Sequence, residues 1–90
     1  MQRRLRLPHD LVTMVRHLPP SVKHKVRSGL TVLSTDPHQG KPLKAEFSGL
    51  WSLRVGRFRI IYRIQPRVIE VIAIGPRATI YSALGTRVRN

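Results

Sequence analysis

The stretch of sequence that decides the fold is LWSLRVGRFRIIYRI, residues 50–64. Apolar and polar side chains alternate on both sides of Gly56, with the two-residue period of a half-buried strand. A glycine between two such runs is typical of a tight hairpin turn. We therefore predict a β-hairpin with a two-residue turn at Val55 and Gly56. The expected cross-strand pairs are Arg54 with Arg57, Ser52 with Arg59, and Leu50 with Ile61.

This register sorts the side chains of the hairpin onto two faces. One face is hydrophobic and is expected to pack on helices; it comprises Trp51, Leu53, Phe58, Ile60 and Tyr62. The other face is polar and basic; it comprises Ser52, Arg54, Arg57, Arg59 and Arg63. Like charges directly opposite each other in a sheet are destabilising, by up to about 1 kcal/mol per pair. The pattern therefore predicts an anion that occupies this arginine face, and an amphipathic hairpin with a merely solvated face is the other interpretation.

The segment before the hairpin predicts a short edge strand and two antiparallel helices. Basic and apolar residues alternate from Arg3 to Leu7, and Pro8 ends that strand. Apolar residues at helical spacing predict a first helix from His9 to Leu18. The second helix is expected to begin at Ser21, after a pair of prolines. Its apolar face comprises Val22, Val26, Leu30 and Leu33.

A turn-rich loop, residues 36–42, leads into the hairpin, and a third strand from Val68 to Ile74 follows it. That strand is almost continuously hydrophobic, which is typical of an interior strand covered on both faces. The sequence shows neither an internal repeat nor a flexible linker. It therefore predicts one α+β domain, residues 1–90, in which two antiparallel helices pack on an antiparallel β-sheet.

The chain is strongly basic, with 17 lysine and arginine residues against 4 acidic residues and a formal net charge of +13. Such a domain repels itself and attracts phosphates or an acidic protein. A basic surface that serves only solubility is the alternative, but surfaces of that kind usually carry both signs of charge. Arginine makes up 13 of the 17 cations, and its planar guanidinium group favours bidentate phosphate contacts. The composition therefore indicates a polyanion as partner, with RNA as the leading candidate.

Several classes of protein are disfavoured by the composition. The absence of cysteine rules out disulfides and zinc–thiolate sites. The histidines lack metal-ligand spacing and the carboxylates fall in different predicted elements, so neither a metal nor another cofactor is expected. No segment has the length and hydrophobicity of a signal peptide or a transmembrane helix. We therefore expect a cytoplasmic protein that does not bind a membrane.

Three groups of residues carry a family resemblance. They are Asp36-Pro37-His38-Gln39-Gly40-Lys41-Pro42-Leu43, the hairpin from Leu50 to Tyr62, and Ile74-Gly75-Pro76-Arg77 with Ile80-Tyr81. Together they are similar to the RelE/ParE superfamily of bacterial and archaeal toxins, over nearly the whole chain. The resemblance implies a RelE-like β-α-α-β-β-β fold and the activity of a messenger-RNA interferase, an endoribonuclease that cuts transcripts in the ribosomal A site and inhibits translation. It also implies a cognate acidic, RelB-like antitoxin, bound in a toxin–antitoxin hetero-oligomer.

The resemblance assigns catalytic roles to four residues. Arg59 matches the hairpin arginine that grips the scissile phosphate, and Arg77 matches the arginine that follows the last strand. Tyr81 matches the C-terminal tyrosine near the cleaved bond. Arg54 falls where RelE-like members have a basic residue on the first hairpin strand.

Two positions depart from the family pattern. Ser52 stands where better-known RelE members have a lysine, and Pro76 stands where many relatives have a histidine. Arginine is a poor acid or base near neutrality, because the pKa of a guanidinium group lies far above 7. Tyr81 is therefore our candidate for proton transfer or for stacking on a base, and a core tyrosine is the alternative interpretation.

The remaining candidates are expected to bind RNA. Arg57 and Arg63 flank the catalytic arginines, and Ser52 shares their face. Lys41 and Lys44, beside the loop into the hairpin, are expected to contact the RNA backbone. Two other functions stay open: a ParE-like toxin that inhibits DNA gyrase without cleavage chemistry, and a weakly active toxin that mainly retains antitoxin binding.

Overall fold

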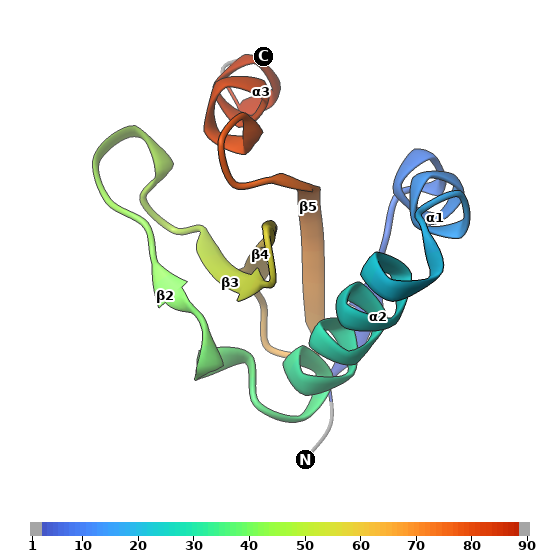
Figure 1. Ribbon diagram of the computed structural model, residues 1–90. Coiled ribbons are helices and arrows are strands. Elements are labelled where there is room, and N and C mark those ends of the chain that lie inside the picture. Colours follow the sequence, from blue (N-terminus) through green and yellow to red (C-terminus); the bar gives the residue numbers. More distant parts are fainter. Residues whose placement is uncertain (1–2, 89–90) are drawn as a thin grey trace.

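The computed structural model describes residues 3–88, which form a five-stranded sheet with helices on both faces (Figure 1). The elements are, in chain order, β1 (Arg4–Arg6), α1 (His9–Arg16), α2 (Pro20–Thr35), η1 (Pro37–Gln39), β2 (Lys41–Pro42), η2 (Ala45–Phe47), β3 (Trp51–Val55), β4 (Phe58–Ile64), β5 (Val68–Pro76) and α3 (Ile80–Val88), where η1 and η2 are short 3₁₀ turns. Within this part of the chain no helix is long and apolar enough to cross a membrane. The predicted α+β class is confirmed.

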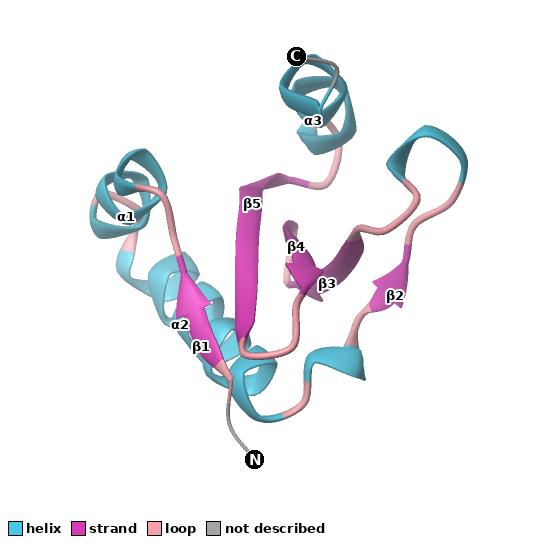
Figure 2. Ribbon diagram, turned by 180° about the vertical axis from the view of Figure 1, so that it is seen from behind, coloured by secondary structure: helices cyan, strands magenta, loops and turns pink. Residues whose placement is uncertain are grey.

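The strands lie in the order β1-β5-β4-β3-β2 (Figure 2). Neighbouring strands are antiparallel except at one edge, where β1 runs parallel to β5 and Arg4 pairs with Val68. The sheet is thus mostly antiparallel. β1 is the predicted edge strand, and β5 lies inside the sheet, as its continuous hydrophobicity indicated.

The turn of the β3–β4 hairpin differs from our prediction. The turn residues are Gly56 and Arg57, and Arg54 pairs with Arg59 instead of Arg57. Gly56 has a φ of +65°. A type II′ turn needs a positive φ at its first central position, which favours glycine. The predicted turn placed Val55 at that position, whereas the observed turn places Gly56 there. The correction moves the partner of Arg54 by two residues. Because an even shift preserves the alternation of the strand, the side chains of β3 and β4 stay on their predicted faces. Arg57, predicted on the arginine face, lies in the turn instead.

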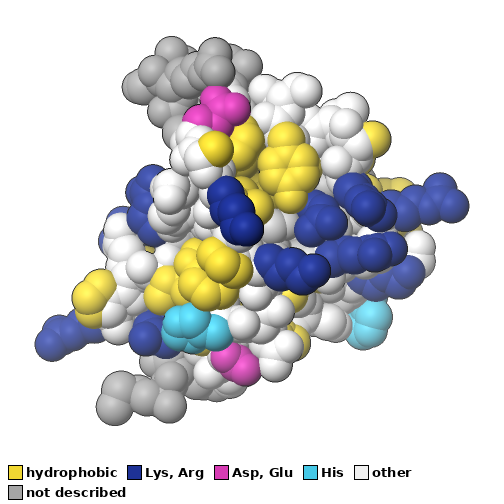
Figure 3. Space-filling view, turned by 90° about the vertical axis from the view of Figure 1, so that its left-hand side faces the viewer, with side chains coloured by type: hydrophobic (Ala, Val, Ile, Leu, Met, Phe, Trp, Pro, Cys, Tyr) yellow, Lys and Arg dark blue, Asp and Glu magenta, His cyan; other side chains and the backbone are white. Residues whose placement is uncertain are grey.

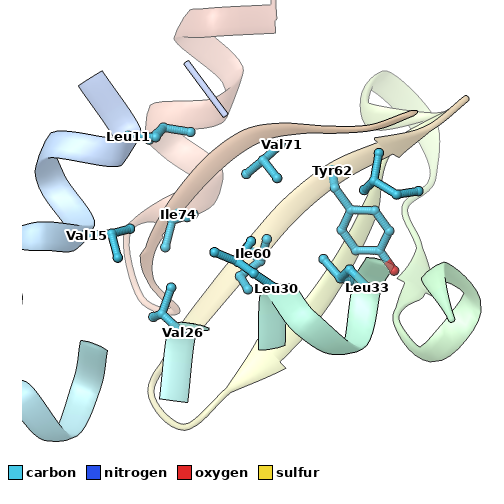
Figure 4. Close-up of a cluster of buried hydrophobic side chains, with 10 residues drawn as sticks. Leu11, Val15, Val26, Leu30, Leu33, Ile60, Tyr62, Val71 and Ile74 are labelled. Atoms are coloured by element: carbon cyan, nitrogen blue, oxygen red, sulfur yellow. The ribbon is translucent and has the colours of Figure 1, made fainter. Parts of the chain in front are cut away.

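The two faces of the sheet carry separate hydrophobic cores. Helices α1 and α2 cover the first face (Figure 4), where Val26 and Leu33 pack against the fully buried Ile60 and Tyr62 of β4. The other hydrophobic side chains of the hairpin, Trp51, Leu53 and Phe58, also pack against this core. Helix α3 covers part of the second face. The core beneath it consists of Leu50, Ile61, Ala73, Ile80 and Leu84.

Several details of the helices and edges were not predicted. Helix α3 was missed, although Ile80 and Leu84 stand four residues apart and both are buried. The two-residue strand β2 lies inside the predicted loop. Helix α1 ends at Arg16 instead of Leu18. Helix α2 begins at Pro20 instead of Ser21, because a proline in the first helical position gives up no intrahelical hydrogen bond.

Candidate functional site

The site is built on the face of the sheet that α3 only partly covers. Residues that pair directly across strands point to the same face. One such row crosses the sheet and consists of Lys41, Ser52, Ile61 and Ala73. Arg54 and Arg59, two residues along their strands, form the next row on that face. Lys41 and Ser52 therefore share a surface with both hairpin arginines.

Ser52 is the buried polar link of this face. The residue is only 3% exposed, and its Oγ accepts hydrogen bonds from Arg59 Nη1 at 3.1 Å and from the Tyr81 hydroxyl at 3.4 Å. We call Ser52, Arg59 and Tyr81 the Ser52 centre. The direct contact with RNA that we expected of Ser52 does not fit its burial. Its position fits a role in holding the other two side chains.

Arg59 is half-buried in this centre. Its Nη1 donates to Ser52, whereas its Nε is buried and has no hydrogen-bond partner within the described residues. Arg54 stands directly opposite, on the neighbouring strand. An unmatched buried donor costs about 1–3 kcal/mol, and like charges that face each other across strands add to that cost. An anion bound to both guanidinium groups would relieve both penalties.

Tyr81 reaches the centre from the first turn of α3. Burial of Ile80 and Leu84 against the sheet fixes the helix, and the Tyr81 ring packs against Phe47 of η2 at 6.2 Å between centroids. The Tyr81 ring thus packs against the core, as the alternative interpretation expected, while its hydroxyl reaches Ser52 on the site face. Phe47 was not predicted as part of the site. It lies far from Tyr81 along the chain, and no sequence pattern links the two rings.

Three arginines gather at the tip of the hairpin. The Arg77 backbone N–H donates to the Arg57 carbonyl oxygen at 2.8 Å, and Arg54 Nε donates to the Gly56 carbonyl oxygen at 3.4 Å. These arginines line a hollow of about 460 Å³, which we call the hairpin hollow. Figure 3 shows lysine and arginine side chains crowded into a band on one side of the molecule, with few acidic side chains nearby. Arg54, Arg57 and Arg77 therefore lie together at the tip of the hairpin, whereas Arg59 and Tyr81 meet at Ser52.

The other predicted RNA contacts are spread over the sheet. Lys41 is exposed and lies beside Ser52 in the register. Lys44 is exposed on the loop before η2. Arg63 is engaged elsewhere, because its Nη1 lies 3.0 Å from Glu70 Oε1 in an ion pair across β4 and β5. The structure thus brings Lys41 to the site and gives Arg63 an acidic partner of its own.

A second tyrosine fixes the edge strand β2 next to the site. Tyr62 is fully buried, and its hydroxyl donates to the Pro37 carbonyl oxygen in η1. Burial raises the pKa of Tyr62 to about 12; the backbone N–H of Gly40 acts against this rise, and the charge of Asp36 adds to it. Gly40 lies so close to the Tyr62 hydroxyl and the Ser52 carbonyl that a Cβ there would clash with both. This close packing locks β2 against β3.

The chemistry available at this site is positive charge and hydroxyl groups. Within residues 3–88, no three His, Asp or Glu side chains come together so as to hold a metal ion. The guanidinium groups can bind a phosphate and stabilise added negative charge on it. The Tyr81 hydroxyl and the Lys41 ammonium group can donate protons.

Comparison with known proteins agrees with this fold. Residues 8–81 match the model of a family described as the ParE toxin of the type II toxin–antitoxin system parDE. A comparison with curated proteins gives no match. A chain of the toxin–antitoxin complex RelBE2 from Mycobacterium tuberculosis is similar with a TM-score of 0.75 and 27% sequence identity, over 86% of this chain and 100% of that one.

The toxin RelE of Escherichia coli, solved as a mutant in the free state, is similar with a TM-score of 0.75 over 99% of this chain and 96% of that one. Its sequence identity of 18% supports the shared fold alone. The family model, in contrast, spans α1, α2, the whole β3–β4 hairpin, β5 and the first residues of α3. The chain therefore belongs to the ParE toxins of type II toxin–antitoxin systems, within the RelE/ParE superfamily.

Proposed function

We propose that this type II toxin is a metal-independent endoribonuclease that cuts messenger RNA in the ribosomal A site and so inhibits translation. The observation that carries the proposal is the Ser52 centre, in which one buried hydroxyl holds Arg59 and Tyr81 on the face that also presents Arg54. A toxin that acts only by binding another protein has no need of a phenol and a guanidinium group held together in this way. The resemblance of these residues to RelE-like motifs supports the same activity.

RNA cleavage without a metal has three requirements: activation of the 2′-hydroxyl, stabilisation of charge on the phosphorane, and protonation of the 5′-oxygen. In our proposal Arg59 and Arg54 bind the scissile phosphate, and Arg77 stabilises the developing charge from the hairpin hollow. Tyr81 takes part in proton transfer through its hydroxyl or stacks on a base. Arg57, Lys44 and, once released from Glu70, Arg63 bind the RNA backbone on either side.

Lys41 is a further candidate for proton transfer. It pairs with Ser52 and points to the same face, on a strand about 4.8 Å away. The resemblance places a lysine at position 52 in better-known members. Here the edge strand β2 presents an ammonium group beside that position instead. We propose that Lys41 supplies the proton donor or acceptor that the serine at 52 cannot.

The partner of a type II toxin is its antitoxin. We propose that the antitoxin is acidic and RelB-like, and that it neutralises the toxin in the cytoplasm as a hetero-oligomer. Two observations support this: the net charge of +13 on the toxin, and the toxin–antitoxin complex in which the similar Mycobacterium tuberculosis protein was solved.

One observation favours a second candidate function. The family model that matches residues 8–81 describes ParE toxins, and the ParE-like activity is inhibition of DNA gyrase by binding. In that case the cationic surface serves the contact with gyrase, and the Ser52 centre has no reaction to perform. A weakly active toxin that mainly binds its antitoxin would also lack that reaction.

Primer extension on messenger RNA from cells that express the toxin separates these functions. A ribosome-dependent nuclease gives in-frame cuts that weaken with Arg59→Ala and with Tyr81→Phe. The matched control is Arg16→Ala, which removes one exposed arginine from α1 and should leave the cuts intact. Whole transcripts together with cleaved gyrase complexes and a DNA-damage response would refute the nuclease and favour the ParE-like function. Intact transcripts in cells that grow normally would indicate a weakly active toxin that mainly binds its antitoxin.

A further inference from the structure

A second basic hollow lies at the opposite end of the sheet from the hairpin hollow. It measures about 610 Å³ and is lined by Arg3, Arg4 and Arg67 together with Pro66 and residues 35–38. We call it the N-terminal hollow. It opens where β1 and β5 begin, whereas the hairpin hollow opens where β5 ends. In Figure 1 β5 stands upright in the middle of the view, with its beginning at the lower end and its end at the upper end, toward α3.

Backbone hydrogen bonds hold the three arginines of the N-terminal hollow together. The Arg4 N–H donates to the Arg67 carbonyl oxygen at 3.1 Å, and the Arg3 N–H donates to the Ser34 carbonyl oxygen at 2.9 Å. Arg4 also pairs with Val68 in the parallel register of β1 and β5. The convergence of these charges is therefore imposed by the fold.

The guanidinium groups of this hollow have spare hydrogen-bond donors. Arg3 Nε is buried without a hydrogen-bond partner, and none of the three arginines forms an ion pair with a carboxylate of the described residues. The carboxylate at the hollow, Asp36, accepts from the His38 backbone N–H at 3.3 Å and from Gln39 Nε2 at 3.0 Å. Three cations against one carboxylate leave the hollow positive, and unmatched guanidinium donors suit a phosphate.

The apolar surface of the molecule lies elsewhere. A groove between α2 and β3 is lined in part by Val32, Leu53 and Val55, and Val32 is an exposed large hydrophobic residue, at 39%. An amphipathic protein segment needs such a groove. The N-terminal hollow is lined by three arginines, and its apolar part includes two prolines, Pro37 and Pro66. It therefore favours a nucleic-acid phosphate over a protein segment.

We propose that the N-terminal hollow binds a backbone phosphate of a folded RNA, as a second contact separate from the phosphate at the Ser52 centre. The choice of RNA rests on the proposed function. The nine residues of β5 separate the two hollows, which at about 3.3 Å per residue places them roughly 25 Å apart. One nucleotide cannot bridge that separation, so the two hollows take different phosphates of an extended RNA surface.

Binding of a fluorescently labelled RNA duplex to the purified toxin, at several salt concentrations, tests this proposal. The variant is Arg4→Gln with Arg67→Gln, both exposed. Its control is Arg16→Gln with Arg27→Gln, which removes the same charge from exposed positions on α1 and α2. We expect the variant to bind roughly three- to tenfold more weakly than the control, with a salt slope reduced by about 1 to 2. Equal losses in both double variants would overturn the proposal, because net charge alone would then explain the binding.

Three further measurements distinguish the possible outcomes. Thermal unfolding of both double variants checks that each folds, and Arg67→Lys, which keeps the charge but removes the planar fork, should bind more weakly than the wild type. Unchanged duplex binding with weakened binding of a co-purified antitoxin would assign the hollow to a protein partner and overturn the proposal. The assay needs neither ribosomes nor cleavage. A toxin that fails to cut messenger RNA can therefore still confirm this site, and a toxin that cuts can still refute it.

Discussion

At the scale of single residues, a buried serine organises the charged groups around it. Ser52 carries no charge, yet its Oγ fixes Arg59 on β4 relative to Tyr81 on α3. A guanidinium group held in place before a ligand binds loses less side-chain freedom on binding than a mobile one. We therefore expect the serine to contribute through position, while the reacting groups lie on the strands and the helix around it.

Replacing Lys41 by alanine tests the proposed proton transfer. If the ammonium group acts as acid or base, the rate of RNA cleavage should fall on the order of 100-fold, the lower end of what such catalysis contributes. Single-turnover cleavage on programmed ribosomes measures that rate. Lys44→Ala is the comparison, because Lys44 is also an exposed lysine, on the loop before η2, and in our proposal it binds the RNA backbone without taking part in proton transfer. Its loss should therefore slow the single-turnover rate only slightly. Equal small losses in both variants would remove Lys41 from the chemistry.

Tyr62 should make the stability of the fold depend on alkaline pH. Its pKa of about 12 in the folded protein lies above the value of about 10 in an unfolded chain. The stabilisation is therefore complete below pH 10 and is lost as the pH rises through 12, by about 2–3 kcal/mol in all. Denaturant unfolding at pH 8, 10 and about 11.5 measures this loss.

The Tyr62→Phe variant is the comparison for that experiment. It should be less stable than the wild type at pH 8 by about 1 kcal/mol, since the Pro37 carbonyl loses its donor. Between pH 10 and 12 it should lose less stability than the wild type does. Tyr81→Phe is the control, because it also removes one tyrosine hydroxyl. If the loss of stability between pH 10 and 12 were reduced in Tyr81→Phe and unchanged in Tyr62→Phe, our explanation would be wrong.

At the scale of elements, the short strand β2 depends on a glycine. Gly40→Ala would place a Cβ 2.6 Å from the Ser52 carbonyl oxygen and against the Tyr62 hydroxyl. Because one of these groups is backbone, β2 must move away from β3. We expect a loss of about 1–3 kcal/mol in the free energy of unfolding, together with slower cleavage because Lys41 moves with the strand.

Gly85→Ala is the matched control for that variant. A Cβ at Gly85 meets nothing within 4 Å, and the residue lies inside α3. Alanine in a helix is favoured over glycine by about 0.5–1 kcal/mol. Chemical denaturation should therefore show Gly85→Ala to be slightly more stable than the wild type and Gly40→Ala to be clearly less stable. The reverse order would contradict the packing described here.

The elements show what local sequence can and cannot predict. The alternation around Gly56 was sufficient to predict β3, β4 and the face of each side chain, because that pattern depends only on the strand period. The pairing register of the hairpin could not be predicted in the same way, because it depends on which turn position Gly56 occupies with its positive φ. Strand β2 has two residues and forms by pairing with β3, beside the close packing of Gly40 against Tyr62. Helix α3 is defined mainly by burial against β4 and β5. Contacts between distant residues of this kind leave little local signal.

At the scale of the whole molecule, a net charge of +13 on 90 residues should make stability depend on salt. Self-repulsion destabilises the compact state, and salt screens it. Raising KCl from about 0.05 M to about 0.3 M, which shortens the screening length to well under 10 Å, should raise the melting temperature of the isolated toxin. Thermal unfolding followed by circular dichroism measures the change.

A matched variant makes the salt prediction specific. Arg16→Gln with Arg27→Gln removes two exposed charges from the helices and should flatten the rise of the melting temperature with salt. A melting temperature that falls as KCl increases would show that attractive ion pairs such as Arg63–Glu70 outweigh the repulsion.

Part of the candidate site could be predicted from the sequence, because the strand period alone decides which face of a strand a side chain occupies. Strand alternation predicts Arg54 and Arg59 on one face, and the family resemblance adds Arg77 and Tyr81. The link through Ser52 was not predicted, because it depends on the depth at which a side chain lies beneath α3. The N-terminal hollow was not predicted either, since residues 3–4 and residue 67 meet only through the pairing of β1 with β5.

The parallel pairing of β1 with β5 also has a consequence for synthesis. Arg4 pairs with Val68, so the first strand leaves the ribosome long before its partner has been made. Closing so long a loop costs more entropy than forming the neighbouring hairpin, although the cost grows only with the logarithm of loop length. The sheet of a nascent toxin therefore stays incomplete until β5 has emerged from the ribosome, so β5 and the hairpin beside it are made while the β1 edge of the sheet is still unpaired.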